Sequence, residues 1–130
     1  RDRVGSVRSA TNLMMVRTIE QVVARGTGLG QREVAGTLVH LNPPLTDDDL
    51  AVGPQDIVFG ESIDRSCVRV IQRAGGLITA DQGLDSPGAI AAVELGIPAV
   101  VGVGDDIHNL TPGEKVILDT TSGRVIKWNK

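Results

Sequence analysis

Aromatic side chains are scarce in this chain, which limits the kind of core that it can build. Phe59 and Trp128 are its single Phe and single Trp, and it has no Tyr, although 41% of its residues are hydrophobic. The core must therefore consist mainly of Val, Ile, Leu and Ala, a mixture that favours β-strands packed against helices of small residues. We predict an α/β fold and expect no stacking of bases or sugars on aromatic rings.

Length and charge set further limits. A chain of 130 residues has room for one domain with one hydrophobic core. Its 13 basic and 16 acidic residues give a net charge of -3 and are scattered along the sequence, so we expect no binding to nucleic acid. The first residue is Arg1 instead of Met, which suggests a segment of a longer parent.

Cysteine content and apolar runs bear on the compartment. Cys67 is the one cysteine, so no internal disulfide can form, and no charged start followed by an apolar run resembles a secretory signal. The longest apolar stretches, such as residues 97–103, are far shorter than the roughly 20 residues that span a bilayer. We therefore expect a cytoplasmic protein without a membrane segment.

Apolar runs bounded by Gly and Pro predict a series of short strands. The first lies within residues 11–23 and is followed by a glycine-rich linker over 24–30. Further strands are expected over residues 35–41, 56–59, 76–80, 98–103, 115–119 and 125–128, the last two joined as a hairpin, with a turn at 111–113.

Two main helices are predicted between these strands. The first runs over residues 62–74, with Ser62 as its N-cap and its apolar side chains, Cys67 among them, spaced along one buried face. We therefore expect a packed, inert thiol. The second begins with Ser86 as N-cap and Pro87 at the first helical position, and it ends at Gly96.

Residues 76–102 join a strand, a glycine-containing loop, a capped helix and a second strand in one compact run. Their sequence, GLITADQGLDSPGAIAAVELGIPAVVG, resembles the mobile domain of enzymes that use phosphoenolpyruvate, such as pyruvate phosphate dikinase. That family has a glycine, then Thr-Ser-His-Ala, a helix, Leu-Gly-Ile-Pro and an apolar strand. Residues 95–102 match most closely. The resemblance implies a swivelling β/β/α sandwich of small sheets with the helices on one side.

In this register Asp85, Ser86, Pro87 and Gly88 stand where the family has Thr, Ser, His and Ala, and Ala89 follows. A phosphoryl carrier needs an imidazole nitrogen that is nucleophilic near neutral pH, and the ring of Pro87 offers none. A phosphate ester on Ser86 would be a poor donor, so we assign this residue to helix capping. We predict a degenerate phosphohistidine site with no catalytic, cofactor-binding or metal-binding residue.

The same five residues are also a candidate anion site. Backbone N–H groups at the start of a helix attract phosphate or sulfate. Pro87 removes one of these donors, and Asp85 adds a negative charge beside them. The alternative is an empty, well-capped helix end.

The other polar candidates favour structural roles. His40, at the end of a strand, and His108, in a loop, both lie away from the helix start, so we expect solvated or capping imidazoles. Three consecutive Asp residues, 47–49, would splay around a short helix over 45–50, so a helix start fits them better than a metal site. One Cys and two separated His give no zinc-ligand spacing.

The first residues suggest the parent. Residues 5–16, GSVRSATNLMMV, resemble the last strand of the pyruvate kinase C-terminal domain, and some bacterial members continue through a glycine-rich linker into an extra swivelling domain. We therefore divide the chain into residues 1–30, the end of the preceding domain with its linker, and 31–130, the swivelling domain. The order of residues 1–30 is left open, since a strand without its parent sheet lacks hydrogen-bonding neighbours.

The resemblance implies a homotetrameric pyruvate kinase parent that transfers phosphate from phosphoenolpyruvate to ADP, in glycolysis, with magnesium and potassium. None of its catalytic residues would lie in this chain. We expect a non-catalytic accessory domain that contributes to assembly, stability or regulation through contacts with the preceding domains. The alternatives are a mobile phosphotransfer domain of a phosphoenolpyruvate synthase or dikinase-like enzyme, and a phosphate-binding module.

Overall fold

The computed structural model describes residues 21–41, 51–61, 63, 65–81 and 85–128. Its strands are β1 (Val22–Arg25), β2 (Thr27–Leu29), β3 (Glu33–His40), β4 (Asp56–Gly60), β5 (Gly76–Thr79), β6 (Ala99–Val101), β7 (Lys115–Asp119) and β8 (Arg124–Lys127). Its α-helices are α2 (Val68–Ile71) and α3 (Pro87–Leu95), and its 3-10 helices are η2 (Arg65–Cys67) and η3 (Gly104–Asn109).

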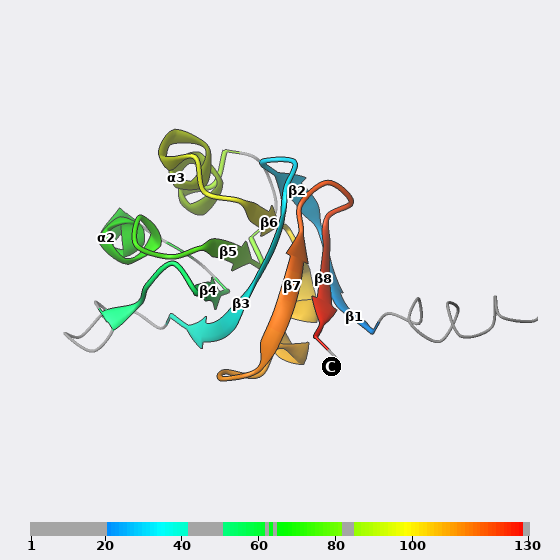
Figure 1. Cartoon of the computed structure of the whole chain (residues 1–130). Coiled ribbons are helices and arrows are strands. Elements are labelled where there is room, and N and C mark those ends of the chain that lie inside the picture. The colour runs from blue at the N-terminus through cyan, green and yellow to red at the C-terminus, as the bar shows by residue number, and fades with distance from the viewer. Residues whose placement is uncertain (1–20, 42–50, 62, 64, 82–84, 129–130) are drawn as a thin grey trace, which may run out of the picture.

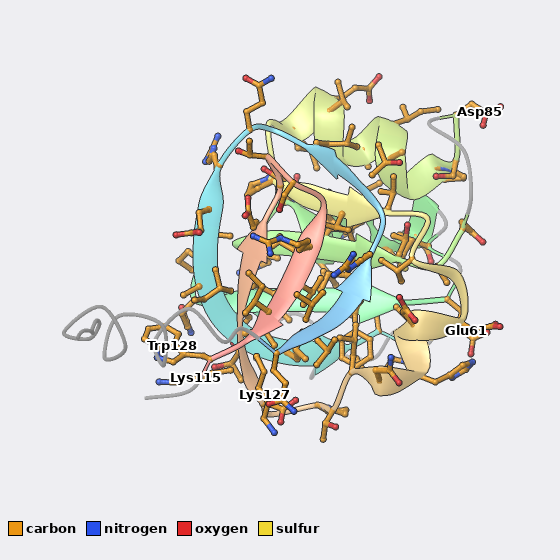
Figure 2. All side chains as sticks on the ribbon, turned by 90° about the vertical axis from the view of Figure 1, so that its right-hand side faces the viewer. Glu61, Asp85, Lys115, Lys127 and Trp128 are labelled. Carbon is orange, nitrogen blue, oxygen red and sulfur yellow. The ribbon has the colours of Figure 1, made fainter. Side chains whose placement is uncertain are left out.

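The strands form one hydrogen-bonded sheet of 8 strands in the order β1-β8-β7-β3-β4-β5-β6-β2. Strands β3, β4, β5 and β6 are parallel to one another, whereas β1, β2, β7 and β8 pair antiparallel with their neighbours. β1 and β2 are separated only by Gly26, yet they stand at opposite ends of this order. The sheet therefore curls until its two ends approach each other (Figures 1 and 2).

The glycine-rich linker predicted over residues 24–30 is wrong, because this segment contains part of β1 and all of β2. Its glycines allow the chain to pass close to strands at the other end of the sheet. A Cβ atom at Gly28 would overlap the backbone of Thr120, and one at Gly26 would overlap the carbonyl of Val101. Glycine is therefore required here by contacts with strands distant in the sequence, which local patterns do not reveal.

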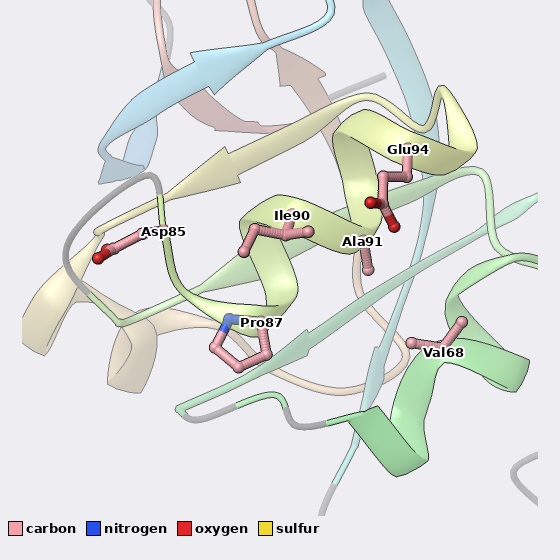
Figure 3. Close-up of a pocket in the computed structure, with 6 residues that line it drawn as sticks. All are labelled: Val68, Asp85, Pro87, Ile90, Ala91 and Glu94. Atoms are coloured by element: carbon pink, nitrogen blue, oxygen red, sulfur yellow. The ribbon is translucent and has the colours of Figure 1, made fainter.

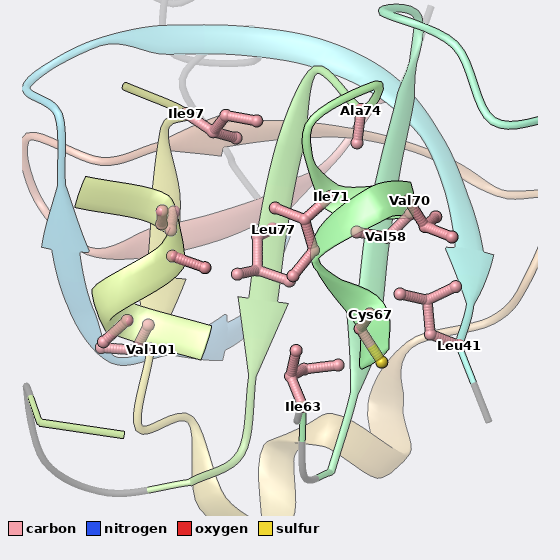
Figure 4. Close-up of a cluster of buried hydrophobic side chains, with 14 of the residues drawn as sticks. Leu41, Val58, Ile63, Cys67, Val70, Ile71, Ala74, Leu77, Ile97 and Val101 are labelled. Carbon is pink, nitrogen blue, oxygen red and sulfur yellow. The ribbon is translucent and has the colours of Figure 1, made fainter. Parts of the chain in front are cut away.

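The central strands bury both of their faces, because successive side chains of a strand point to opposite sides. One cluster lies inside the curled sheet and includes Ile57, Phe59, Ile78, Val100 and Leu118. The other lies between the sheet and the helices and includes Val58, Cys67, Ile71, Leu77 and Ala92 (Figure 4). These two clusters confirm the predicted α/β class and the β/β/α layers, but both β layers belong to one continuous sheet.

The first predicted helix is wrong in its extent. Among the described residues of 62–74, only those of α2 and the preceding η2 are helical. The β-branched residues Val68, Val70 and Ile71 make up most of α2, and they lower helix propensity. After Ile71 the chain tightens into a turn, in which the N–H of Ala74 donates to the carbonyl of Ile71 at 3.0 Å. The predicted buried face is nevertheless correct, with Cys67 fully buried as expected.

The other predicted elements are confirmed wherever the structure describes them. β3 to β6 correspond to the four central predicted strands, and β7 with β8 forms the predicted hairpin. Three predictions lie wholly or largely outside the described residues: the part of the first strand segment, 11–23, that precedes residue 21, the short helix over 45–50 with its three Asp residues, and the cap at Ser62. In the described part of the chain, no helix has the length and apolar character to span a membrane.

Candidate functional site

The helix start predicted at residues 86 and 87 is confirmed. Ser86 is extended, with φ −68° and ψ 152°, and its side chain accepts a long hydrogen bond of 3.4 Å from the N–H of Ala89. Pro87 occupies the first helical position, where its missing N–H leaves no intrahelical bond unmade. Gly96 ends α3 in the left-handed conformation, with φ +70°.

The five candidate residues lie in sequence around this helix start. Asp85 and Pro87 are exposed, Ser86 is half-buried, and Gly88 and Ala89 are buried. A Cβ atom at Gly88 would lie 3.1 Å from Cγ2 of Thr79 and 3.2 Å from Cβ of Ile63. The glycine therefore lets α3 lie close to β5, where the family pattern has Ala.

A groove of about 570 Å³ runs between α2 and α3. Figure 3 shows the described residues that line it, which are Val68, Asp85, Pro87, Ile90, Ala91 and Glu94. Both charged side chains of this lining are carboxylates. A phosphate or sulfate at the start of α3 would therefore lie near negative charge, which weakens the case for an anion site.

Thr79, at the end of β5, lies next to this helix start. Its side chain is 1% exposed, and its Oγ1 has no hydrogen-bond partner among the described residues. Its methyl group faces Gly88, because Cγ2 is the atom that a Cβ there would approach. No local pattern signals this buried hydroxyl, since threonine is an ordinary strand residue.

The two histidines converge on a second hollow of about 220 Å³, and this convergence was not predicted. His40 and His108 line it with Glu61 and Phe59, and the ring of His40 packs against that of Phe59 with centroids 5.0 Å apart. Parallel strands end at the same edge of a sheet, and His40 and Glu61 stand at the ends of β3 and β4. The shared edge could have predicted that His40 and Glu61 lie close together. The position of His108 could not be predicted in this way, because it depends on the path of the chain through η3.

The described residues contain no group of three or more His, Cys, Asp or Glu side chains arranged to hold a metal ion. The two imidazoles and Glu61 therefore do not form a metal site. The structure brings Asp85 to Ala89 together at one helix end and keeps Cys67 in the core beneath the helices. What the helix end offers chemically is a hydroxyl engaged in capping and a ring without a nucleophilic nitrogen.

The family description "PEP-utilising enzyme, mobile domain" matches residues 52–123. Pyruvate kinase of Staphylococcus aureus strain USA300 is 33% identical over 119 residues, which make up 90% of this chain and 20% of that protein. The chain thus spans about a fifth of the length of the curated relatives that it matches.

Solved structures agree with this match. The solution structure of Enzyme I (nEIt) is 31% identical, with a TM-score of 0.52 over 63% of this chain and 33% of that chain. Aconitase X of Thermococcus kodakaraensis shares the fold, with a TM-score of 0.58 at 21% identity over 82% of this chain and 98% of that one. Since the family match covers more than half of its length, the chain belongs to the mobile domain family of PEP-utilising enzymes.

Proposed function

We propose that this chain is a non-catalytic, C-terminal accessory domain of a cytoplasmic pyruvate kinase and contributes to its assembly, stability or regulation. The observation that carries the proposal is a family fold with an intact helix start that holds Pro87 in place of a phosphoryl-accepting histidine. The 33% identity to pyruvate kinase over 90% of the chain supports the choice of parent.

The chemistry of the helix start supports the non-catalytic role. The nitrogen of Pro87 is a peptide nitrogen whose electron pair is delocalised, so it cannot attack a phosphoryl group. Ser86 Oγ accepts the N–H of Ala89, and the nearby carboxylate of Asp85 would repel an incoming phosphate. No residue of this helix start is therefore equipped both to accept a phosphoryl group and to pass it on.

The reaction itself would belong to the other domains of the parent. Such a parent would transfer phosphate from phosphoenolpyruvate to ADP, as a tetramer with magnesium and potassium. In the described part of this chain, no group of three or more His, Cys, Asp or Glu side chains could hold a metal ion. We assign both ions to the other domains of the parent.

Deletion of the whole domain from the parent tests the proposal. Because β1 pairs with β8, the deletion has to start at residue 21 and not within residues 24–30. We expect catalysis at saturating substrate to persist, while the assembly state, the melting temperature or the response to effectors changes. A truncated parent that matches the intact enzyme in all three properties would refute the proposal. Phosphorylation of residues 85–89 by phosphoenolpyruvate would favour the phosphotransfer alternative instead.

A further inference from the structure

Helix α3 exposes apolar side chains on its outer surface. In the described part of the chain, the exposed large hydrophobic residues are Val93 at 65%, Ile90 at 45%, Trp128 at 40% and Leu95 at 39%. All but Trp128 lie on α3, whose sequence PGAIAAVEL contains one charged residue, Glu94. A solvent-facing helix ordinarily has a polar outer face, so this helix has the composition of one that is covered on both sides.

The exposed apolar surface continues on both sides of the helix. Ile90 and Pro87 line the groove toward Val68 of α2 (Figure 3). Val93 lines a second hollow of about 200 Å³ on the other side, together with Leu29 of β2. We call this surface, made of Leu29, Val68, Pro87, Ile90 and Val93, the α3 face.

Charges at the border of the α3 face restrict what can cover it. Asp85 and Glu94 are both carboxylates in the lining of the groove, and one lies at each end of α3. Arg32 lines the second hollow, on the other side of α3, where its guanidinium donates to the carbonyl of Gly96 at 3.3 Å. A partner that excludes water from this groove has to compensate both charges, because a buried carboxylate without a counter-charge is costly. The complementary surface is therefore apolar, with Lys or Arg at its edge.

A second copy of this chain does not meet that requirement. In a two-fold contact through α3 the helices run antiparallel or parallel, according to the direction of the axis. The antiparallel arrangement sets Asp85 of one copy near Glu94 of the other, and the parallel arrangement sets each carboxylate near its own counterpart, so like charges approach each other in both. The α3 face therefore fits a different surface better than its own copy.

We infer that the α3 face docks onto the preceding domains of the pyruvate kinase parent, on an apolar surface bordered by Lys or Arg. This inference rests on the proposed function and adds to it the contact surface. The matched relatives have about four fifths of their length outside the region that this chain covers, so such a parent offers a large surface for the contact.

Thiol labelling tests the inference. A Val93→Cys variant is made in the full-length parent and in the 130-residue chain alone, with Thr121→Cys in the exposed β7–β8 turn as the matched control. Native Cys67 is fully buried, and peptide mass spectrometry assigns each label to its site. We expect the thiol of Val93→Cys to react with a maleimide at least tenfold more slowly in the parent than in the chain alone. The thiol of Thr121→Cys should react equally in both.

A charge reversal tests the recognition chemistry. Glu94→Lys in the Val93→Cys background should reduce this protection several-fold, while Asp105→Lys, an exposed acid of η3, should leave it unchanged. Equal labelling of the Val93→Cys thiol in the parent and in the chain alone would overturn the inference. So would protection in the chain alone that rises with its concentration, because it would identify a second copy as the occupant. Either result leaves the proposed function intact if deletion of the domain still alters the parent.

Discussion

Two threonine hydroxyls are buried in the described part of the chain, and they differ in their partners. Thr120 Oγ1 accepts a 2.7 Å hydrogen bond from the N–H of Arg32 and donates one of 2.9 Å to the carbonyl of the same residue. Thr79 Oγ1 has no partner among the described residues. A buried polar group without a partner costs about 1–3 kcal/mol, so the two hydroxyls should contribute to stability with opposite signs.

Replacement of each threonine by Val keeps the shape and removes the hydroxyl. We expect Thr79→Val to leave the free energy of unfolding unchanged or to raise it by about 1 kcal/mol, since no hydrogen bond is lost. Thr120→Val should lower it by about 1 kcal/mol, because the N–H of Arg32 loses its acceptor, while the carbonyl of Arg32 keeps the 2.8 Å bond from the N–H of Thr120. Urea unfolding measures both values, and equal losses in the two variants would contradict the assignment.

Asp119 organises the turn between β7 and β8. Its carboxylate accepts a 2.9 Å hydrogen bond from the hydroxyl of Ser122, and it also accepts bonds from two backbone N–H groups and from Arg124. The Ser122 hydroxyl bond has the largest effect and lowers the pKa of Asp119, and burial, the next largest, opposes it. The bonds from the two backbone N–H groups and from Arg124 lower it further, so the pKa lies below its ordinary value of 3.8. The ionised form is therefore favoured in the folded state.

A lowered pKa in the folded state makes stability depend on pH. The contribution of Asp119 is fully present above the unfolded pKa of 3.8, and it is lost as the pH falls through the lower folded value. We expect Asp119→Asn to be less stable than the wild type near neutral pH, with a difference that shrinks in acid below the ordinary pKa. Urea midpoints of both proteins, measured across this pH range, test the expectation. A stability difference that does not change with pH would argue against stabilisation by the ionised carboxylate.

At the scale of elements, the helix start of α3 depends on a weak cap. The hydrogen bond from the N–H of Ala89 to Ser86 Oγ is 3.4 Å long, near the limit for such bonds. We expect Ser86→Ala to lower the free energy of unfolding by about 0.5–1 kcal/mol, at the lower end of capping losses. Ser86→Asp restores an acceptor and should recover most of that loss in thermal unfolding. A loss above that range, or no recovery with Asp, would point to another role for the hydroxyl.

Gly28 of β2 lies against the backbone of Thr120, and this close contact leaves no room for a side chain. We expect Gly28→Ala to destabilise the fold by about 3 kcal/mol, because the added methyl group would overlap the backbone of Thr120. Gly53→Ala is the matched control, since its methyl group would meet the movable side chain of Gln55. A similar, small loss in both variants, measured by urea unfolding, would show that the sheet ends do not meet as described.

Elements with local signals were predictable from the sequence, and those that depend on distant contacts were not. Ser86, Pro87 and Gly96 mark the ends of α3 within the helix itself, so its bounds were predicted closely. The role of Gly28 is set by Thr120, far along the chain, so its segment resembled a linker. The candidate residues 85–89 are consecutive in the sequence, so their place at one helix start could be predicted, while their role as a site stays a prediction. The convergence of His40 and His108 depends on distant parts of the chain and was missed.

At the scale of the whole molecule, the fold separates the two surfaces that an accessory domain needs. β1, the first described strand, and α3 lie on different sides of the molecule (Figure 1). Trp128, the exposed hydrophobic residue outside α3, lies beside Lys115 and away from Asp85 (Figure 2), with the Lys115 ammonium 5.8 Å from its ring centre. The contact inferred between the α3 face and the preceding domains therefore lies on a different side of the molecule from β1.

The central claim is that the family fold persists here without its phosphoryl-transfer chemistry. Its most direct test is to incubate the full-length parent with phosphoenolpyruvate and to analyse the peptide that contains residues 85–89 by mass spectrometry under conditions that preserve phosphohistidine. A family member that retains the histidine serves as the positive control. We predict that the control acquires a phosphoryl group and that the peptide from this chain keeps its unmodified mass. A phosphoryl group on Ser86, or on any other residue of that peptide, would contradict the claim.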